Sequence, residues 1–438
     1  MTKDQLQNHY KGILDQGKMS RFQIIIVAIC VILNMNDGID VLIVSFSTGD
    51  IIKEWGLSKF DMGYVFSMGL FGMMIGSLLI APLGDKVGRK LIFIVCLFMI
   101  SLGMFLVSVC TSYEQLLAFR LITGLGIGGI LPTLTATASE FSNNKNRDFN
   151  VGLVQAGWPL GAIFTGFFCA YAIPNFGWRF PFFIAGCFSL IMLIVVLIYM
   201  HDSFDFLLKK QTKSTLQKIN VILKKMKQEE IITLPPVTLQ PKSASLKRLF
   251  DVNFRNSTLK LWAAMFFGFF TLYTLMSWVP TIAKDSGLEF SLATYAGVLL
   301  NVGAMLGTIC LGWLARKLSL KRTVFSFLIF AFIVMLIYGN ISLSTVLIFI
   351  FIFLIGVFVQ GGFNGLYAIL SRVYPTEIRA TGVGYAVGIG RLGAILGPTF
   401  FGFLSDDGMS ISMLFTLFSI PLLVTGIVVF KLKSIHLK

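Results

Sequence analysis

Residues 22–46 read FQIIIVAICVILNMNDGIDVLIVSF, an almost unbroken apolar run that contains two carboxylates. A helix of roughly 20 apolar residues crosses the ~30 Å hydrocarbon core of a bilayer, so this run is predicted to be a transmembrane helix. Comparable runs follow near 60–82, 91–111, 114–136, 151–172, 180–200, 258–283, 291–314, 322–340, 342–369, 380–404 and 411–432. The predicted fold is all-α: an integral membrane protein with twelve transmembrane helices.

The composition supports the same class of protein. Of 438 residues, 56% are hydrophobic and 13% are charged, whereas soluble domains carry about 25% charged residues. The net charge of +15 is read as cytoplasmic charge beside anionic lipid. A nucleic-acid partner is not expected, because the sequence contains no basic soluble domain.

The distribution of basic residues predicts the orientation. If the N-terminus is cytoplasmic, 30 of the 36 Lys and Arg fall on the cytoplasmic side, as the positive-inside rule requires. The outer loops then collect acids, namely Asp50, Glu54, Asp285, Glu289, Asp406 and Asp407. Both termini are therefore predicted to be cytoplasmic, in a bacterial inner (plasma) membrane.

The chain divides into two halves that resemble each other. We expect a six-helix bundle over residues 1–200, a cytoplasmic central loop over 201–257 and a second six-helix bundle over 258–438. The sequence LGAI at 160–163 recurs at 392–395, and Gly76 corresponds to Gly307 at nearly the same offset. Two pseudo-symmetric bundles with a site at their interface are typical of a secondary transporter.

Motifs for other chemistry are nearly absent from the sequence. It contains no Walker A loop, and the run GLGIGG at 124–129 lies inside an apolar span, where it indicates close helix packing. The six cysteines lie singly in apolar spans, and His9, His201 and His436 lie outside the spans. We therefore expect no enzyme activity, no metal site and no cofactor, with a proton gradient as the energy source.

Charged residues inside the spans are the candidate functional residues. A charge at the bilayer centre costs about 2.5–3.5 kcal/mol on insertion scales, so one that is present is a functional candidate. Asp37 and Asp40 lie three residues apart, on one face of a helix, and are predicted to bind the transported proton. The alternative is that one of them only pairs with Arg120, for which proton coupling and a structural role are both open.

Arg391 lies between Gly388, Gly390 and Gly393, and its guanidinium suits a carboxylate. It is predicted to bind an anionic substrate, the alternative being a fixed pair between helices. Candidate residues lining this site are the polar or aromatic Gln155, Trp158, Tyr273, Gln360, Asn364 and Tyr367. Ionic gate or scaffold pairs are predicted at the cytoplasmic ends of the spans, with Glu140 near Arg147, Glu377 near Arg379, and Asp85 with Arg89 as a latch.

Residues 81–90, APLGDKVGRK, resemble the signature that the major facilitator superfamily carries between its second and third helices. Residues 120–126, RLITGLG, resemble the motif of its fourth helix. The corresponding loop of the second half, GWLARK at 312–317, has Arg316 where the signature has Asp. The resemblance covers essentially the whole chain.

A narrower resemblance is to the aromatic acid:proton symporter family. It rests on DGID at 37–40, SWVP at 277–280, QGGFN at 360–364, YPTEIR at 374–379 and the glycine-rich run 382–398 around Arg391. This resemblance implies proton-driven uptake of organic or aromatic carboxylic acids, and it assigns the two aspartates and Arg391 to transport. Residues 201–205, HDSFD, depart from the PESPR motif of sugar porters and weaken a sugar-porter interpretation.

The function expected from the sequence is symport of a proton and a small anionic organic acid by alternating access. The protein is expected to be a monomer in contact with membrane lipid. A sugar or polyol porter, a proton-coupled efflux antiporter and a non-transporting receptor of the same fold remain as alternatives. The sequence does not specify which acid is carried, the direction of transport or the proton stoichiometry.

Overall fold

The computed structural model describes residues 19–202, 206–207, 213–226, 228, 230, 234, 246–252, 254–341 and 344–432. Within these ranges, twelve helices are long and apolar enough to span a membrane, as predicted. They are α2 (Arg21–Trp55), α3 (Lys59–Ile75), α5 (Arg89–Ser108), α6 (Tyr113–Glu140), α7 (Arg147–Phe176), α8 (Arg179–Tyr199), α11 (Arg255–Asp285), α12 (Phe290–Lys317), α13 (Leu320–Asn340), α14 (Thr345–Val373), α15 (Thr376–Asp406) and α16 (Ile411–Phe430).

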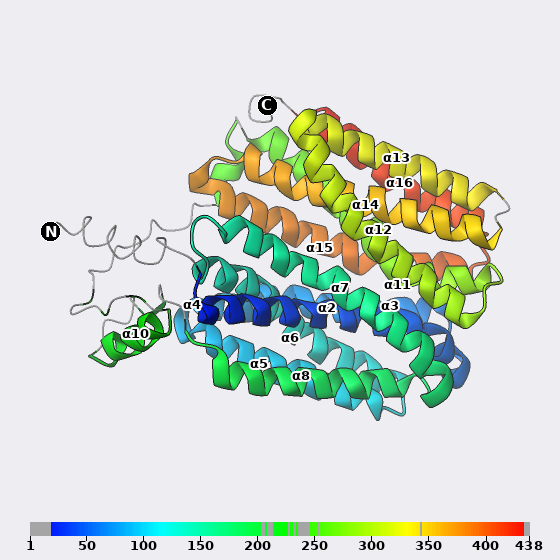
Figure 1. Ribbon diagram of the computed structural model, residues 1–438. Coiled ribbons are helices and arrows are strands. Elements are labelled where there is room, and N and C mark those ends of the chain that lie inside the picture. Colours follow the sequence, from blue (N-terminus) through cyan, green and yellow to red (C-terminus); the bar gives the residue numbers. More distant parts are fainter. Residues whose placement is uncertain are drawn as a thin grey trace.

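The twelve helices form two bundles that lie side by side (Figure 1). Helices α2 to α8 form the N-bundle, and helices α11 to α16 form the C-bundle. Because each bundle crosses the membrane six times, α2 begins and α16 ends on the same face, which we call the terminal face. The face that carries the α2–α3 and α15–α16 connections is called the far face.

The two bundles repeat the same helix packing. In the N-bundle, Gly161 of α7 lies against the backbone of Met35 in α2. In the C-bundle, Gly393 of α15 lies against the backbone of Phe266 in α11. Met35 and Phe266 are 231 residues apart, close to the offset of the two glycines, so corresponding helices make corresponding contacts. The pseudo-symmetric fold predicted from the LGAI repeat is confirmed.

The second pair of matched glycines behaves in the same way. Gly76 lies against the carbonyl of Leu125 in α6, and Gly307 lies against the carbonyl of Val357 in α14. The glycines of the GLGIGG run also meet neighbouring helices, with Gly128 against the backbone of Met73 in α3. Close packing between helices is the role of this run, as the sequence predicted.

Some helices end later than the predicted spans, because a capping residue, and not the end of the apolar run, terminates the helix. Helix α2 continues to Trp55 and ends at Gly56, whose φ of 62° is the left-handed conformation that glycine adopts easily. Asp50 and Glu54, predicted in an outer loop, therefore lie in the last turns of this helix. Hydropathy missed these turns because they extend past the apolar segment.

Helix α3 continues as a π-helical turn, η1 (Gly76–Ile80), and a 3-10 turn, η2 (Ala81–Leu83), that contains Pro82. The short helix α4 (Gly84–Val87) follows, and Gly88 with a φ of 106° redirects the chain into α5. In the central loop, the described elements are α10 (Lys213–Lys225) and η3 (Leu246–Phe250).

His201 connects the end of α8 to α10. Its Nδ1 lies 2.8 Å from the carbonyl of Tyr199, and its Nε2 lies 2.9 Å from the ammonium of Lys225. Burial, and the positive charge of Lys225, lower the pKa of His201 below its ordinary value. The neutral imidazole uses both nitrogens here, donating from Nδ1 and accepting at Nε2.

Candidate functional site

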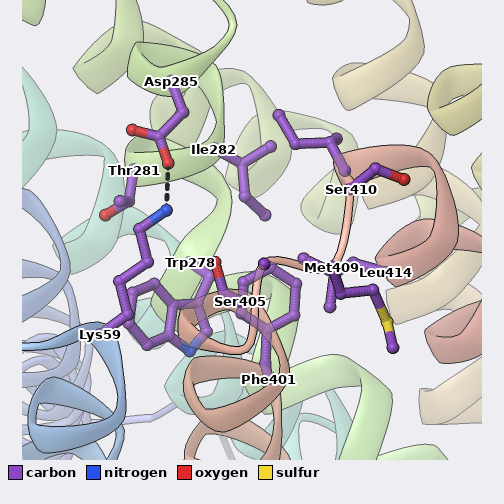
Figure 2. Close-up of a pocket in the computed structure, with 12 residues that line it drawn as sticks. Lys59, Trp278, Thr281, Ile282, Asp285, Phe401, Ser405, Met409, Ser410 and Leu414 are labelled. Atoms are coloured by element: carbon purple, nitrogen blue, oxygen red, sulfur yellow. Dashed lines mark hydrogen bonds and ion pairs between the residues drawn. The ribbon is translucent and has the colours of Figure 1, made fainter.

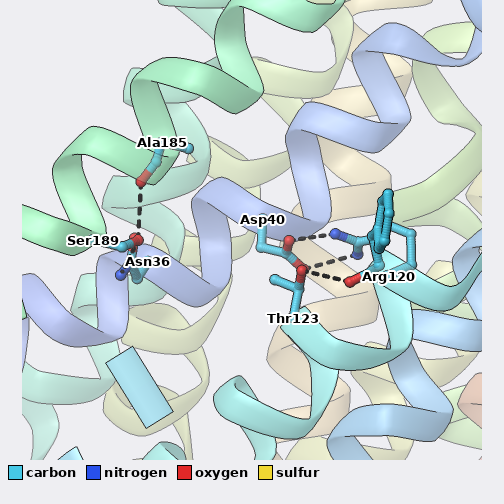
Figure 3. A network of polar contacts seen from close by, with 7 residues as sticks. Asn36, Asp40, Arg120, Thr123, Ala185 and Ser189 are labelled. Atoms are coloured by element: carbon cyan, nitrogen blue, oxygen red, sulfur yellow. Dashed lines mark hydrogen bonds and ion pairs between the residues drawn. The ribbon is translucent and has the colours of Figure 1, made fainter. Parts of the chain in front are cut away.

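Arg120 of α6 and Asp40 of α2 form a buried ion pair inside the N-bundle (Figure 3). The guanidinium contacts both carboxylate oxygens, with Nη2 at 2.8 Å from Oδ2. The side chains are only 4% and 1% exposed. Two parallel N–H···O bonds fix the relative positions of the two helices as well as neutralising the charges.

A glycine makes room for this ion pair. A Cβ atom at Gly69 of α3 would lie 2.7 Å from Nη2 of Arg120, closer than real Cβ atoms approach. Nearby, Asn36 of α2 donates to Ser189 of α8 at 3.0 Å, and Ser189 donates to the carbonyl of Ala185 (Figure 3). The polar residues of this part of α2 are thus held by α6 and α8.

Asp37 occupies a different environment from Asp40. It is 4% exposed, and its Oδ1 atom is buried with no hydrogen-bond partner among the described residues. The charge of Arg391, from α15 of the C-bundle, acts on it, and Trp158 of α7 lies beside it. The sequence predicted that one aspartate would pair with Arg120, and the structure shows that Asp40 does so.

Arg391 is half-buried where the two bundles meet. Tyr273 and Tyr367 lie near its guanidinium. The Phe269 ring centre lies 5.8 Å from its Cζ atom, and the rings of Phe269 and Tyr273 are stacked. The Nη1 atom of Arg391 is buried without a partner among the described residues. The structure therefore brings together Asp37, Trp158, Tyr273, Tyr367 and Arg391, which we call the central cluster.

The remaining predicted site residues lie on α14 and α7. Asn364 donates to Thr308 at 2.7 Å and accepts from Gln360 at 3.2 Å, so these amides form a network between α14 and α12. The Oε1 atom of Gln360 is buried and has no hydrogen-bond partner among the described residues. Gln155 is exposed on α7, one turn before Trp158.

The central cluster is open toward the terminal face. Tyr367 is 36% exposed, and a Cβ atom at Gly384 or Gly388 would meet no atom within 4 Å. Both glycines precede Arg391 on α15 by one or two helical turns, on the side of the terminal face. Open space therefore lies beside Arg391 in this direction.

Toward the far face, the bundles are in contact. The Ser45 hydroxyl of α2 donates to the carbonyls of Met276 and Ser277 in α11, at 3.0 and 2.6 Å. Pro280 has no N–H, so the carbonyl of Met276 lacks its usual partner within the helix and Ser45 supplies one. Sequence reasoning missed Ser45, although a proline four residues after Met276 signals a free carbonyl.

A second contact joins α3 to α15. Ser67 donates to the carbonyl of Ile395, and its oxygen lies 2.6 Å from the hydroxyl of Thr399. Gly63 of α3 lies against the backbone of Thr399, which allows the two helices to approach closely. These contacts close the far side of the central cluster.

The charged residues of the terminal face include one clear pair. Arg89 of α5 lies 2.5 Å from Glu140 of α6. The sequence placed Glu140 near Arg147, and that pairing stays a prediction, while the structure adds Arg89 as a partner of Glu140 because α5 and α6 are packed together. The Asp202 carboxylate, which sequence reasoning missed, accepts a hydrogen bond from the Lys90 amide at 3.2 Å and so caps α5.

Of the other predicted gate pairs, the structure describes the side chain of only one partner each. Arg379 donates from Nε to the carbonyl of Tyr374 at 3.3 Å. The side chains of Asp85 and Glu377 lie outside the described residues, so the latch of Asp85 with Arg89 and the pair of Glu377 with Arg379 stay predictions.

Comparison with known proteins identifies the family. Residues 26–350 match the sequence profile of the Major Facilitator Superfamily. The chain is 30% identical to the 4-hydroxybenzoate transporter PcaK of Acinetobacter baylyi over 96% of its own length and 93% of that protein. It is 29% identical to the gallate transporter of Pseudomonas putida, over 94% of the chain and 92% of that protein.

The fold is shared with solved structures at lower identity. A bacterial homologue of the human lysosomal transporter Spinster, in an inward-facing and occupied conformation, superposes with a TM-score of 0.74 at 17% identity, over 95% of this chain and 97% of that one. With its twelve apolar helices, the chain is a multi-pass integral membrane protein and not an enzyme. It belongs to the Major Facilitator Superfamily of transporters and is similar over nearly its full length to curated aromatic acid transporters.

Proposed function

We propose that the protein takes up a small aromatic carboxylate together with protons, by alternating access of the central cluster to the two sides of the membrane. The names of its relatives, which transport 4-hydroxybenzoate and gallate, support this substrate class. We further propose that both termini are cytoplasmic in a bacterial inner membrane and that the protein acts as a monomer. In that orientation, the described state is open to the cytoplasm.

The observation that carries the proposal is the pair of unsatisfied atoms in the central cluster. Nη1 of Arg391 and Oδ1 of Asp37 are buried without hydrogen-bond partners among the described residues. Leaving such a group unsatisfied costs about 1–3 kcal/mol, and more for a charged group, so a site of this kind is built to receive a ligand. A carboxylate accepts from Arg391, while Trp158 and Tyr367, which are only partly buried, are the rings that can pack against an aromatic ring.

The same geometry suggests how a proton is coupled to the substrate. Asp40 already has a bidentate partner in Arg120, so Asp37 is the carboxylate that we assign to proton binding. When a substrate carboxylate binds Arg391, the guanidinium no longer compensates the negative charge of Asp37, which is then left in a site shielded from water. A proton on Asp37 then removes the uncompensated charge. This lowers the cost of burying the occupied central cluster while the two bundles reorient.

This arrangement disfavours the sugar or polyol alternative. A neutral solute would leave the Arg391 guanidinium and the Asp37 carboxylate facing each other across the bundles, with no role in its recognition. An efflux antiporter would use the same cluster in the opposite direction. Measuring the direction of transport in oriented vesicles separates these two modes.

The test is uptake into proteoliposomes under an imposed proton gradient, with 4-hydroxybenzoate, gallate, benzoate and xylose as solutes. We expect accumulation of the aromatic acids only, and its loss when an uncoupler is added. Arg391→Ala should lower uptake by about 10- to 100-fold, since a charge-assisted hydrogen bond is worth about 1.5–3 kcal/mol. Arg391→Lys is the matched variant that keeps the charge.

Asp37→Asn separates coupling from binding. An amide imitates the protonated carboxyl, so we expect this variant to exchange labelled for unlabelled acid while losing accumulation driven by the proton gradient. Acid uptake that is unchanged in Arg391→Ala, or accumulation that is unaffected by an uncoupler, would refute the proposal.

A further inference from the structure

The first turn of α3 begins at the far face with four backbone amides that have no partner within the helix. Two of these are satisfied locally. The Ser58 amide donates to Oδ2 of Asp61 at 3.0 Å, and the Asp61 amide donates to the Ser58 hydroxyl at 3.1 Å. These reciprocal bonds form a capping box within the N-bundle.

The other two amides are satisfied by the C-bundle. The amide of Lys59 donates to Oδ1 of Asp406 at 3.1 Å, and the amide of Phe60 donates to Oδ2 at 2.6 Å. Asp406 is the last residue of α15. Its carboxylate thus receives both remaining donors, at the end of α3 where the helix dipole is positive and favours an anion.

The surrounding contacts fit this arrangement. Gly402 of α15, one turn before Asp406, lies against the backbone carbonyl of Lys59, so the two helix ends touch directly. The Lys59 ammonium also pairs with Asp285 of α11 at 2.6 Å (Figure 2). A single turn of α3 is therefore held by two helices of the opposite bundle.

We propose that Asp406 is a helix cap supplied by the opposite bundle, and that this cross-bundle cap stabilises the state in which the far face is closed. Opening the far face separates α3 from α15, which removes the acceptor of two amides and the anion at the end of the helix. The inference rests on the proposed alternating access but not on the identity of the solute.

A cavity next to Lys59 lies beside the cap. It has a volume of about 440 Å³ and is lined by Lys59, Asp285, Ser405 and Gly408 together with apolar residues (Figure 2). Water entering here can reach the end of α3 and replace the carboxylate as acceptor. The cap therefore favours the closed state without locking it.

The cap should matter more than the neighbouring ion pair. The side chains of Lys59 and Asp285 are 31% and 39% exposed, and an exposed ion pair must order two flexible side chains for little gain in stability. Asp406 is exposed too, but it accepts from main-chain amides that the helix already holds in place. Removing a helix cap, by comparison, should change the equilibrium between the closed and open states of the far face by about five-fold. Asp406→Asn keeps the size of the side chain but leaves one acceptor oxygen and places an amide donor against the second N–H.

The experiment measures the distance between the bundles at the far face. Spin labels are attached at Glu114→Cys in α6 and Thr345→Cys in α14, two exposed positions on different bundles, with Cys187 and Cys310 replaced by serine. Pulsed dipolar spectroscopy of the full-length protein in lipid nanodiscs then gives the ratio of long to short distances. The readout does not depend on transport, so it can fail or succeed independently of the proposed substrate and of proton coupling.

We expect Asp406→Asn to raise the ratio of far-face-open to closed molecules about five-fold. Asp406→Glu should restore part of the closed population, and Lys59→Met should have the smaller effect of an exposed ion pair. Asp407→Asn, which removes the same charge one residue later, is the matched control and should leave the ratio unchanged. Equal ratios in Asp406→Asn and Asp407→Asn would overturn the proposal, as would a larger effect of Lys59→Met.

Discussion

Four charged side chains of the described spans form one ion pair and one set of two charges that act on each other from opposite bundles. Asp40 and Arg120 belong to the same bundle and satisfy each other through two hydrogen bonds. Asp37 and Arg391 belong to different bundles, and each keeps a buried atom without a partner among the described residues. The first pair can persist through a rigid-body movement of the bundles, whereas the second pair must change with it.

The first pair leads to a stability prediction. Arg120→Met should destabilise the protein by about 3–5 kcal/mol, because it leaves the Asp40 carboxylate buried without its partner. Thermal unfolding of the purified protein, followed by intrinsic fluorescence, measures the loss. The double variant Asp40→Asn/Arg120→Met should recover much of the stability, since no buried charge is left. Additive losses in the double variant would show that the two side chains do not act as a pair.

Corresponding helices of the two bundles pack together at corresponding glycines, and in the C-bundle this packing determines the position of Arg391. Gly393 lets α15 lie against α11, and Gly161 does the same for α7 and α2. Both α11 and α15 contribute residues to the central cluster, so the distance between these helices determines the position of the guanidinium relative to Tyr273 and Phe269.

Gly393→Ala should therefore disturb the packing of α15 against α11. The new Cβ would collide with the carbonyl of Phe266, a backbone atom that cannot move aside as a flexible side chain would. We expect a loss of thermal stability of about 1–3 kcal/mol and reduced uptake. Gly312→Ala in α12 is the control, because its Cβ would meet no atom within 4 Å and alanine favours a helix. Equal stability of the two variants would contradict this account.

The apolar runs predicted the twelve helices, because a span must be long and apolar whatever its neighbours are. The repeated glycines predicted the pseudo-symmetry because close packing requires small residues at those positions. The sequence could not show which aspartate pairs with Arg120, since residues three apart share a helix face. Pro280 signalled a free carbonyl and Asp406 was placed near the outer surface, but the sequence did not show that Ser45 and Asp406 bind backbone groups of another helix.

Taken as a whole, the molecule is closed toward the far face and open beside Arg391 toward the terminal face. The closure rests on Ser45, Ser67 and Asp406, each of which contacts backbone atoms of the opposite bundle. The opening is marked by Gly384 and Gly388, which have free space beside them. In the alternating access proposed above, this arrangement corresponds to the state that is open at the terminal face.

Labelling of an introduced cysteine tests this asymmetry. In a variant with Cys187 and Cys310 replaced by serine, Gly388→Cys should react with a membrane-impermeant maleimide faster in inverted vesicles than in right-side-out vesicles. The physical reason is the open path from the terminal face to position 388. Faster labelling in right-side-out vesicles would contradict the proposed orientation or the open state of this face.

The contact between Asp406 and α3 uses main-chain donors, and this has an evolutionary consequence. Any residue except proline supplies an amide at positions 59 and 60, so substitutions there leave the contact intact. In an alignment of relatives, Asp406 would thus show no covarying partner, and methods that infer contacts from correlated substitutions would overlook it. Side chains that bind the backbone of a moving neighbour can hold a transporter closed while leaving almost no trace in pairwise residue statistics.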